Sequence, residues 1–153
     1  DCGVTYCVEA VNRFETCIIN TAAEALDYVA RVDSPNIGVL LDTYHMNIEE
    51  TSFAKAIEAV GPERLKSFHT GENNRTAPGR GHINWDEIFS SLAKIGYRGP
   101  IVSEPFVMQG GEVGRDIHVF RDLVENPCEA VIDAEAAYLL DFERNMLKKY
   151  YAD

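Results

Sequence analysis

Short apolar runs alternate with longer amphipathic stretches along this chain. The Val39-Leu40-Leu41 run is apolar on both faces, as in a parallel strand that is covered on both sides. The amphipathic stretches carry apolar residues at helical spacing. Strands are therefore predicted at 4–10, 37–42, 65–69 and 100–104. Helices are predicted at 21–32, 52–60, 85–95, 115–124 and 129–150.

Residues that start and stop helices support these boundaries. Thr21 and Glu24 have the spacing of a capping box, and Asn84 can cap the helix that follows it. Gly61-Pro62 is a strong helix breaker. The order of strand and helix repeats four times, which predicts a parallel sheet.

Four βα units cannot close a barrel of eight, and an open sheet of four strands exposes two edges. We therefore expect an α/β fold in which parallel (β/α) units form the C-terminal half of a (β/α)₈ TIM barrel. Residues 1–153 are expected to form a single domain, equivalent to strands 5–8 plus the C-terminal helices. The chain begins at Asp1 and enters a strand almost at once, so we expect an upstream portion to be absent. Self-association as a homo-oligomer, or association with a missing N-terminal half, is expected.

Composition narrows the range of partners. The 153 residues are 46% apolar, which is enough for a core, and the net charge is −11 with 14 basic and 25 acidic residues. This balance disfavours nucleic acid and anionic membranes as partners. Neither a membrane-span-length apolar run nor a signal peptide is found. The four cysteines form no CxxC pair, which indicates free thiols in a reducing compartment and predicts a cytoplasmic protein.

Each predicted strand ends at or beside a residue of metal-ligand type, namely Glu9, Asp42, His69 or Glu104. The carboxyl ends of parallel barrel strands meet at one rim, where such enzymes build their active sites. Three carboxylates placed together repel one another unless a cation neutralises them. Carboxylates bind hard divalent cations, and imidazole suits Mn, Fe, Co, Ni or Zn. The pattern thus predicts a divalent metal site.

Three residues in the loops after these strands, Glu15, His45 and Arg75, offer hydrogen-bonding groups for a small polyol or carbonyl substrate. The reaction class that we expect is proton transfer at a carbon beside a carbonyl, with a divalent ion stabilising the enediolate. Glu9 and Glu104 could serve as base and acid.

Six segments of the chain resemble the ketose 3-epimerases, that is, the D-tagatose and D-psicose (allulose) 3-epimerases among the xylose isomerase-like barrels. They are EAVNRFE (9–15), LDTYHMNIEE (41–50), HTGENNR (69–75), PGRGH (78–82), WDEI (85–88) and SEPF (103–106). The resemblance covers nearly the whole chain, in order and with matching spacing. The first four βα units of that family have no counterpart here.

The resemblance implies a role for each matching position. Glu9, Asp42, His69 and Glu104 match the metal ligands, with Mn²⁺ as the expected ion and Co²⁺ or Mg²⁺ as alternatives. Glu9 and Glu104 also match the two residues that exchange the C3 proton of a free ketose through a cis-enediolate. Glu15, His45 and Arg75 match the groups that hold the O1, O2 and O3 end of the sugar.

Other interpretations remain open from the sequence. The chain could be a related sugar isomerase, an inosose dehydratase-like enzyme, or a truncated fragment without activity; the charge disfavours a zinc nuclease. Asp42 could simply cap the following loop, and Arg75 could form a surface ion pair with Glu72. The helix at 129–150 could pack on the barrel wall or on a partner subunit.

Overall fold

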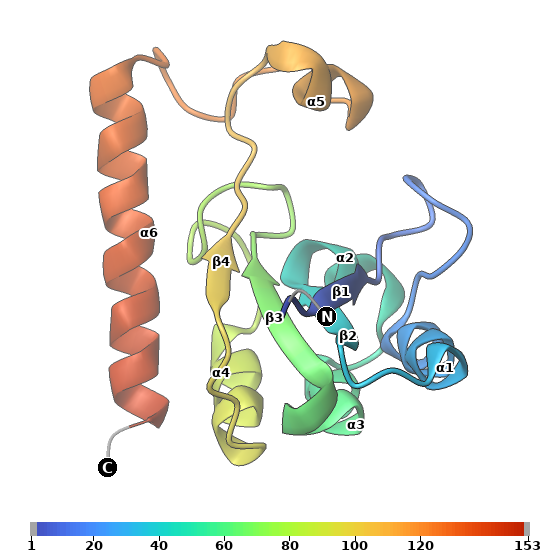
Figure 1. Cartoon of the computed structure of the whole chain (residues 1–153). Helices are drawn as coiled ribbons and strands as arrows, with labels where there is room; N and C mark the ends of the chain where they lie inside the picture. Colours follow the sequence, from blue (N-terminus) through green and yellow to red (C-terminus); the bar gives the residue numbers. More distant parts are fainter. Residues whose placement is uncertain (1–2, 152–153) are drawn as a thin grey trace.

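The computed structural model describes residues 3–151, which form four successive βα units and a long C-terminal helix (Figure 1). The helices and strands, in chain order, are β1 (Tyr6–Glu9), α1 (Ala22–Val32), β2 (Ile37–Asp42), α2 (Thr43–Glu49), α3 (Phe53–Arg64), β3 (Leu65–Thr70), α4 (Trp85–Lys94), β4 (Ile101–Ser103), α5 (Gly111–Asp116) and α6 (Glu129–Tyr150).

The strands form one parallel sheet in the order β1-β2-β3-β4, so each strand lies beside its neighbour in sequence. Asp42 is paired with His69 at the ends of β2 and β3, and Glu9 is paired with Leu40. The carboxyl ends of all the strands therefore lie at the same edge of the sheet. This confirms the predicted fold class of parallel (β/α) units.

The core lies between one face of the sheet and the helices. Val39, Leu41 and Phe68 point to this face and are 0% exposed. They pack beneath α1 and α3, and α4 lies beside α3. On the other face, Leu40 is half-buried and Val102 is exposed. The apolar run of β2 thus faces helices on one side and, within residues 3–151, an uncovered surface on the other.

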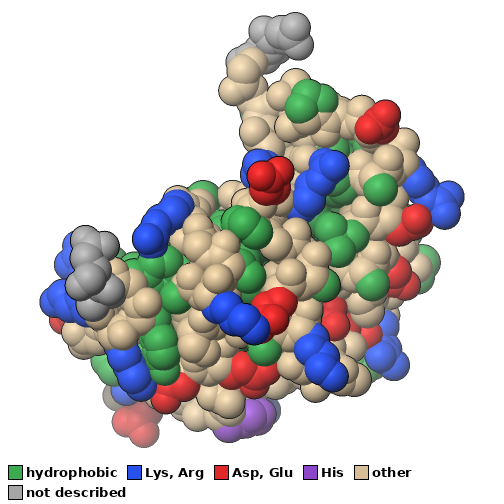
Figure 2. Space-filling view, turned by 90° about the horizontal axis from the view of Figure 1, so that it is seen from below, with side chains coloured by type: hydrophobic (Ala, Val, Ile, Leu, Met, Phe, Trp, Pro, Cys, Tyr) green, Lys and Arg blue, Asp and Glu red, His purple; other side chains and the backbone are tan. Residues whose placement is uncertain are grey.

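Helix α6 packs on α4, as expected for a helix on a barrel wall (Figure 1). The ring of Phe142 meets Trp85 edge-on, with 5.6 Å between the ring centroids. Lys149 Nζ and Tyr150 Oη both donate to Asp86 Oδ1 at 2.7 Å. At the end of the molecule away from α5, charged side chains of both signs are scattered among apolar ones (Figure 2).

Three helices differ from the sequence-based expectation. Helix α3, predicted to end at residue 60, continues to Arg64 across a kink at Gly61, whose φ is 68°, so Gly61-Pro62 bends this helix. Helix α2 was not predicted; it starts directly after β2 because the Asp42 side chain accepts a hydrogen bond from Tyr44 N and caps it. The helix predicted at 115–124 is α5, which lies at Gly111–Asp116. It ends there because His118 has a left-handed backbone, with φ 65°.

Among the described residues, no helix is long and apolar enough to cross a membrane. Cys7, Cys17 and Cys128 are free thiols. Cys2, for which a free thiol was also predicted, lies outside the described residues.

Candidate metal centre

Four residues from the four strands converge at the carboxyl edge of the sheet. Glu9 ends β1, Asp42 ends β2, His69 is the last residue but one of β3, and Glu104 follows β4 directly. One ligand atom from each lies within 4.8 Å of the others. The structure therefore brings together the residues that the strand-end pattern singled out, and their role as metal ligands remains a prediction.

Three buried atoms in this cluster have no hydrogen-bond partner. They are Glu9 Oε1, Asp42 Oδ2 and His69 Nδ1. The other oxygen of Asp42 accepts from Tyr44 N at 2.7 Å, so capping uses only one side of this carboxylate. Because the great majority of buried polar atoms in proteins are satisfied, three unsatisfied atoms at one place indicate a partner shared by all. Carboxylate oxygens and an imidazole nitrogen fit a divalent cation.

The cluster concentrates negative charge. Burial, followed by the charges of Asp42 and Glu104, raises the pKa of Glu9 to about 7. Burial also raises the pKa of Asp42 to about 6. The His69 ring lowers the pKa of Glu104, and the Glu104 carboxylate, 3.7 Å from His69 Nδ1, raises the pKa of His69. A cation between these groups would favour the ionised carboxylates.

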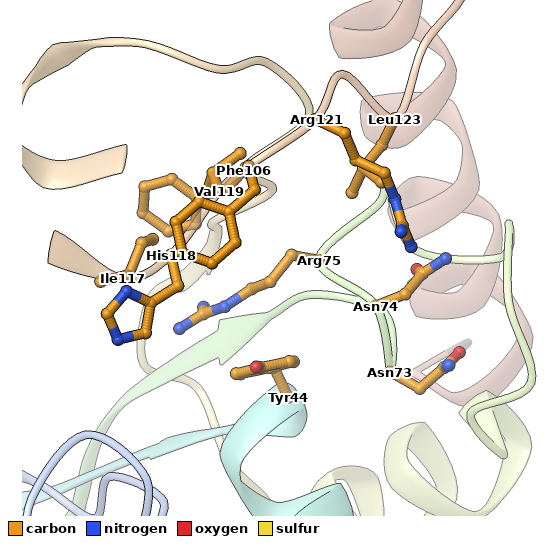
Figure 3. A pocket seen from close by; sticks show the side chains of 11 residues that line it. Tyr44, Asn73, Asn74, Arg75, Phe106, Ile117, His118, Val119, Arg121 and Leu123 are labelled. Carbon is orange, nitrogen blue, oxygen red and sulfur yellow. The ribbon is translucent and has the colours of Figure 1, made fainter. Parts of the chain in front are cut away.

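Arg75 points into the cluster. Its Nη1 lies 3.3 Å from Glu104 Oε2 and 3.5 Å from Asp42 Oδ2, and its guanidinium lies 4.0 Å above the Tyr44 ring (Figure 3). The alternative of a surface ion pair with Glu72 is wrong, because Arg75 is 9% exposed and its charged partners are Glu15, Asp42 and Glu104. Arg75 has φ 65°, and this left-handed backbone turns the side chain inward.

His45 lies between Asn12 and the cluster. The backbone N–H of Asn12 can only donate, and it lies 3.2 Å from His45 Nδ1, so Nδ1 must accept. Burial, followed by the charge of Arg75, lowers the pKa of His45 to about 4 and keeps the ring neutral. Its Nε2 lies 3.2 Å from Arg75 Nη2, which can only donate, and 3.7 Å from Glu9 Oε1, so donor groups face both ring nitrogens.

Asn12 is a site residue that the sequence analysis missed. It is 1% exposed, and its side-chain amide contacts His45 Nδ1 at 2.8 Å and donates to Glu15 Oε1 at 3.0 Å. Glu15 Oε1 lies 3.8 Å from Arg75 Nη2. Asn12 thus contacts two of the three residues predicted to bind substrate, and its place within the EAVNRFE segment was the available signal.

Glu72 organises the loop at 70–84 that carries Arg75. Its carboxylate is 0% exposed and accepts hydrogen bonds from four donors. These are Trp85 Nε1 at 2.6 Å, Gly79 N at 2.8 Å, Ile83 N at 3.2 Å and Asn73 N at 3.3 Å. The loop is therefore held from inside by one carboxylate rather than by regular secondary structure.

A cavity of about 540 Å³ lies beside Arg75 (Figure 3). The side chains of Tyr44, Phe106 and Arg75 form one part of its wall, and the segment after α5 forms another, with Ile117, His118 and Arg121. The loops after β3 and β4 thus leave room for a small molecule between the Arg75 side chain and the segment after α5.

The family described as xylose isomerase-like TIM barrel matches residues 1–136. This chain belongs to that family. D-psicose 3-epimerase of Ruminiclostridium cellulolyticum is 52% identical over 147 residues, which are 96% of this chain and 50% of that protein. D-psicose 3-epimerase of Agrobacterium fabrum is 48% identical over the same share of each chain.

Solved structures agree with this placement in the xylose isomerase-like barrels. A D-psicose 3-epimerase crystallised in the presence of D-fructose has a TM-score of 0.91, with 48% identity over 95% of this chain and 50% of that one. The resemblance to the ketose 3-epimerases is thus confirmed. The chain spans about half the length of the curated relatives that it matches.

The charges of this barrel site predict how metal and pH affect stability. The folded-state pKa values of Glu9 and Asp42 lie above 4.5 and 3.8, so both groups bind protons more tightly when folded. Without metal, these two carboxyl groups should make the free energy of unfolding fall as the pH rises from about 4.5 to 7, and the lowered pKa of His45, which has the opposite effect, should offset only part of that fall. Mn²⁺ at about 100 times its Kd should restore about 2.7 kcal/mol at pH 7, which corresponds to a Tm increase of about 5–10 °C.

Calorimetry at pH 5 and pH 7, with Mn²⁺ or with EDTA, measures both effects. Glu63→Gln, at an exposed position, is the control for loss of one acidic group. A Tm at pH 7 that Mn²⁺ leaves unchanged would contradict the assignment of the cluster as a metal site.

Proposed function

We propose that this chain supplies the metal-binding half of a ketose 3-epimerase, which exchanges the C3 proton of a free ketose through a cis-enediolate. The observation that carries the proposal is the cluster of Glu9, Asp42, His69 and Glu104, whose buried unsatisfied atoms face one another. The D-psicose 3-epimerases among the relatives support the choice of reaction.

In this proposal the four residues hold one divalent ion. Mn²⁺ is the ion that we propose, with Co²⁺ or Mg²⁺ as alternatives, because three carboxylate oxygens and one imidazole nitrogen suit each of them. A bound divalent ion polarises the substrate carbonyl and offsets the negative charge that develops on its oxygen.

Glu9 and Glu104 are the proposed acid and base. They come from β1 and from the end of β4, the two outer strands of the sheet, so they approach the site from opposite sides. A pKa of about 7 for Glu9 suits a group that accepts and returns a proton near neutral pH. Glu104, whose pKa is lowered by His69, is ready to accept a proton.

His45, Arg75 and Glu15 are the proposed substrate-binding groups. The neutral His45 ring offers its Nε2 atom, and Arg75 offers a guanidinium that is already held between Glu104 and Asp42. Glu15 offers a carboxylate beside Arg75. An imidazole nitrogen, a guanidinium and a carboxylate in this arrangement fit the hydroxyl and carbonyl groups at one end of a free sugar.

We also propose that residues 1–153 act as one half of a closed (β/α)₈ barrel. Within the described residues, β1 and β4 each pair on one side only, and the sheet face with Leu40 and Val102 is uncovered. A further cavity of about 290 Å³ lies between β4 and α6, lined by Ser103, Leu139 and other residues. A second (β/α)₄ half, in the same polypeptide or another chain, would cover these surfaces. The free thiols support the proposal of a cytoplasmic location.

One experiment tests the reaction and the assembly together. The purified chain is sedimented to record its assembly state, and is then incubated in D₂O with Mn²⁺ and D-fructose, D-psicose or D-tagatose. The proposal predicts an assembly larger than the 17.1 kDa monomer, a C3-epimeric ketose and deuterium at C3. An aldose product would favour a C1–C2 isomerase, and an unsaturated product a dehydratase. A Mn²⁺-loaded assembly that alters none of these sugars would favour a non-catalytic fragment.

A further inference from the structure

A buried carboxylate on α6 joins the two strands that carry His69 and Glu104. Glu143 is 7% exposed, and its Oε1 accepts hydrogen bonds from Thr70 Oγ1 and Ser103 Oγ, each at 2.5 Å. The two hydroxyl oxygens lie 2.9 Å from each other. The three side chains therefore form a closed triangle between the helix and both strand ends.

This triangle lies directly behind two of the proposed metal ligands. Thr70 follows His69, and Ser103 precedes Glu104. Since successive side chains of a strand point to opposite faces, Thr70 and Ser103 face α6 while their neighbours face the metal cluster. Any shift of these hydroxyls thus moves the backbone from which His69 and Glu104 project.

Glu104 depends on this support because β4 is short. The strand has three residues, pairs only with β3 among the described residues, and ends before Glu104. Thr70 and Ser103 are the last paired residues of the ladder. Beyond them, the backbone of Glu104 is held by one hydrogen bond, from its N–H to the carbonyl of Thr70, at 2.9 Å.

Packing of the helix alone gives no reason for a carboxylate here. Within residues 3–151, Glu143 forms no ion pair, and a buried carboxylate without a cation is costly compared with an apolar side chain. The contact of Phe142 with Trp85 already packs the same turn of α6 against α4. A carboxylate at position 143 is explained by its two hydrogen bonds, because one oxygen accepts from the hydroxyl groups of both Thr70 and Ser103.

We propose that Glu143 is a positioning residue, which sets the spacing of His69 and Glu104 by binding Thr70 and Ser103 and thereby tightens the binding of a divalent ion. The proposal rests on the proposed metal site. Helix α6 would then help to position two metal ligands, in addition to covering the sheet.

The test is a Mn²⁺ titration of the whole chain, with free Mn²⁺ measured by electron paramagnetic resonance. Glu143→Leu should raise the Kd for Mn²⁺ by about 10-fold or more, as loss of a supporting hydrogen bond does at other metal sites. Glu143→Gln keeps a carbonyl oxygen that can accept from both hydroxyls, and its Kd should stay within about threefold of wild type.

Phe142→Leu is the matched control, because it loosens α6 from α4 without changing the triangle. It should lower the Tm but leave the Kd for Mn²⁺ within about twofold. If circular dichroism shows that Glu143→Leu does not fold, Ser103→Ala replaces it and should raise the Kd by about threefold or more.

The outcomes separate the two proposals. Wild-type chain that binds no Mn²⁺ would overturn the metal site and the role of Glu143 together. Tight binding by wild type and equally tight binding by Glu143→Leu, or by its Ser103→Ala replacement, would overturn the role of Glu143 alone. If the Kd for Mn²⁺ rises as much in Phe142→Leu as in Glu143→Leu, the affinity for the ion depends on the packing of α6 against α4 and not on the Glu143 hydrogen bonds, which would also overturn the role of Glu143.

Discussion

Glu104→Gln is expected to lower the rate of C3 proton exchange by at least about 10³-fold while leaving the fold intact, because a general acid or base contributes about 10²–10⁴-fold and a ligand is weakened as well. The amide has nearly the shape of the carboxylate but cannot take up the proton or carry the charge that faces Arg75 Nη1 at 3.3 Å. The measurement is deuterium incorporation at C3 of D-fructose, followed by NMR on the Mn²⁺-loaded protein in D₂O.

Glu58→Gln is the control for this prediction. Glu58 lies on α3, outside the cluster, where it pairs with Lys94 at the surface, and its loss should leave exchange unchanged. Bound Mn²⁺ is measured in both variants, so that loss of the ion is told apart from loss of the proton acceptor. Exchange at the wild-type rate in Glu104→Gln would remove this residue from the chemistry.

Glu72→Leu is expected to destabilise the chain by about 3 kcal/mol or more, because each buried donor left without an acceptor costs about 1–3 kcal/mol. Four donors lose their acceptor, among them Trp85 Nε1 and Gly79 N. The loop at 70–84 should then lose its fixed conformation and release Arg75 from the cluster. Urea unfolding measures the stability, and Trp85 fluorescence reports on the loop.

Glu72→Gln gives an intermediate case. The amide keeps the oxygen that accepts from Trp85 and Gly79, but it places an NH₂ group against the N–H groups of Asn73 and Ile83. Its loss of stability should lie between those of Glu72→Leu and the exposed control Glu63→Gln. A Glu72→Leu variant as stable as that control would show that the loop is held by other contacts.

The sheet and the cluster could be predicted from sequence because both follow from regular rules. Short apolar strands that alternate with helices predict a parallel sheet, and a parallel sheet places the carboxyl ends of its strands at one edge. Asp42 and His69 therefore meet through the β2–β3 register, although they are far apart in the chain. The same rules say nothing about side chains in loops, which explains why the sequence left open a surface ion pair with Glu72 as the role of Arg75.

The features that sequence did not reveal depend on tertiary contacts. Asn12 matters because it is buried against His45, and Glu143 because α6 brings it to Thr70. Helix α2 was missed because one side-chain cap on Asp42 starts a short helix without an apolar stripe. The shortened α5 reflects the left-handed backbone of His118, which residue preferences do not predict.

The most direct test of the metal site is an anomalous difference map from crystals grown with Mn²⁺. The expected result is one peak within about 2.0–2.6 Å of oxygens from Glu9, Asp42 and Glu104 and of a nitrogen from His69, the usual range for divalent ions with such ligands. A map without a peak at this cluster, or with Mn²⁺ bound only elsewhere on the chain, would contradict the proposed metal centre and the epimerase chemistry that depends on it.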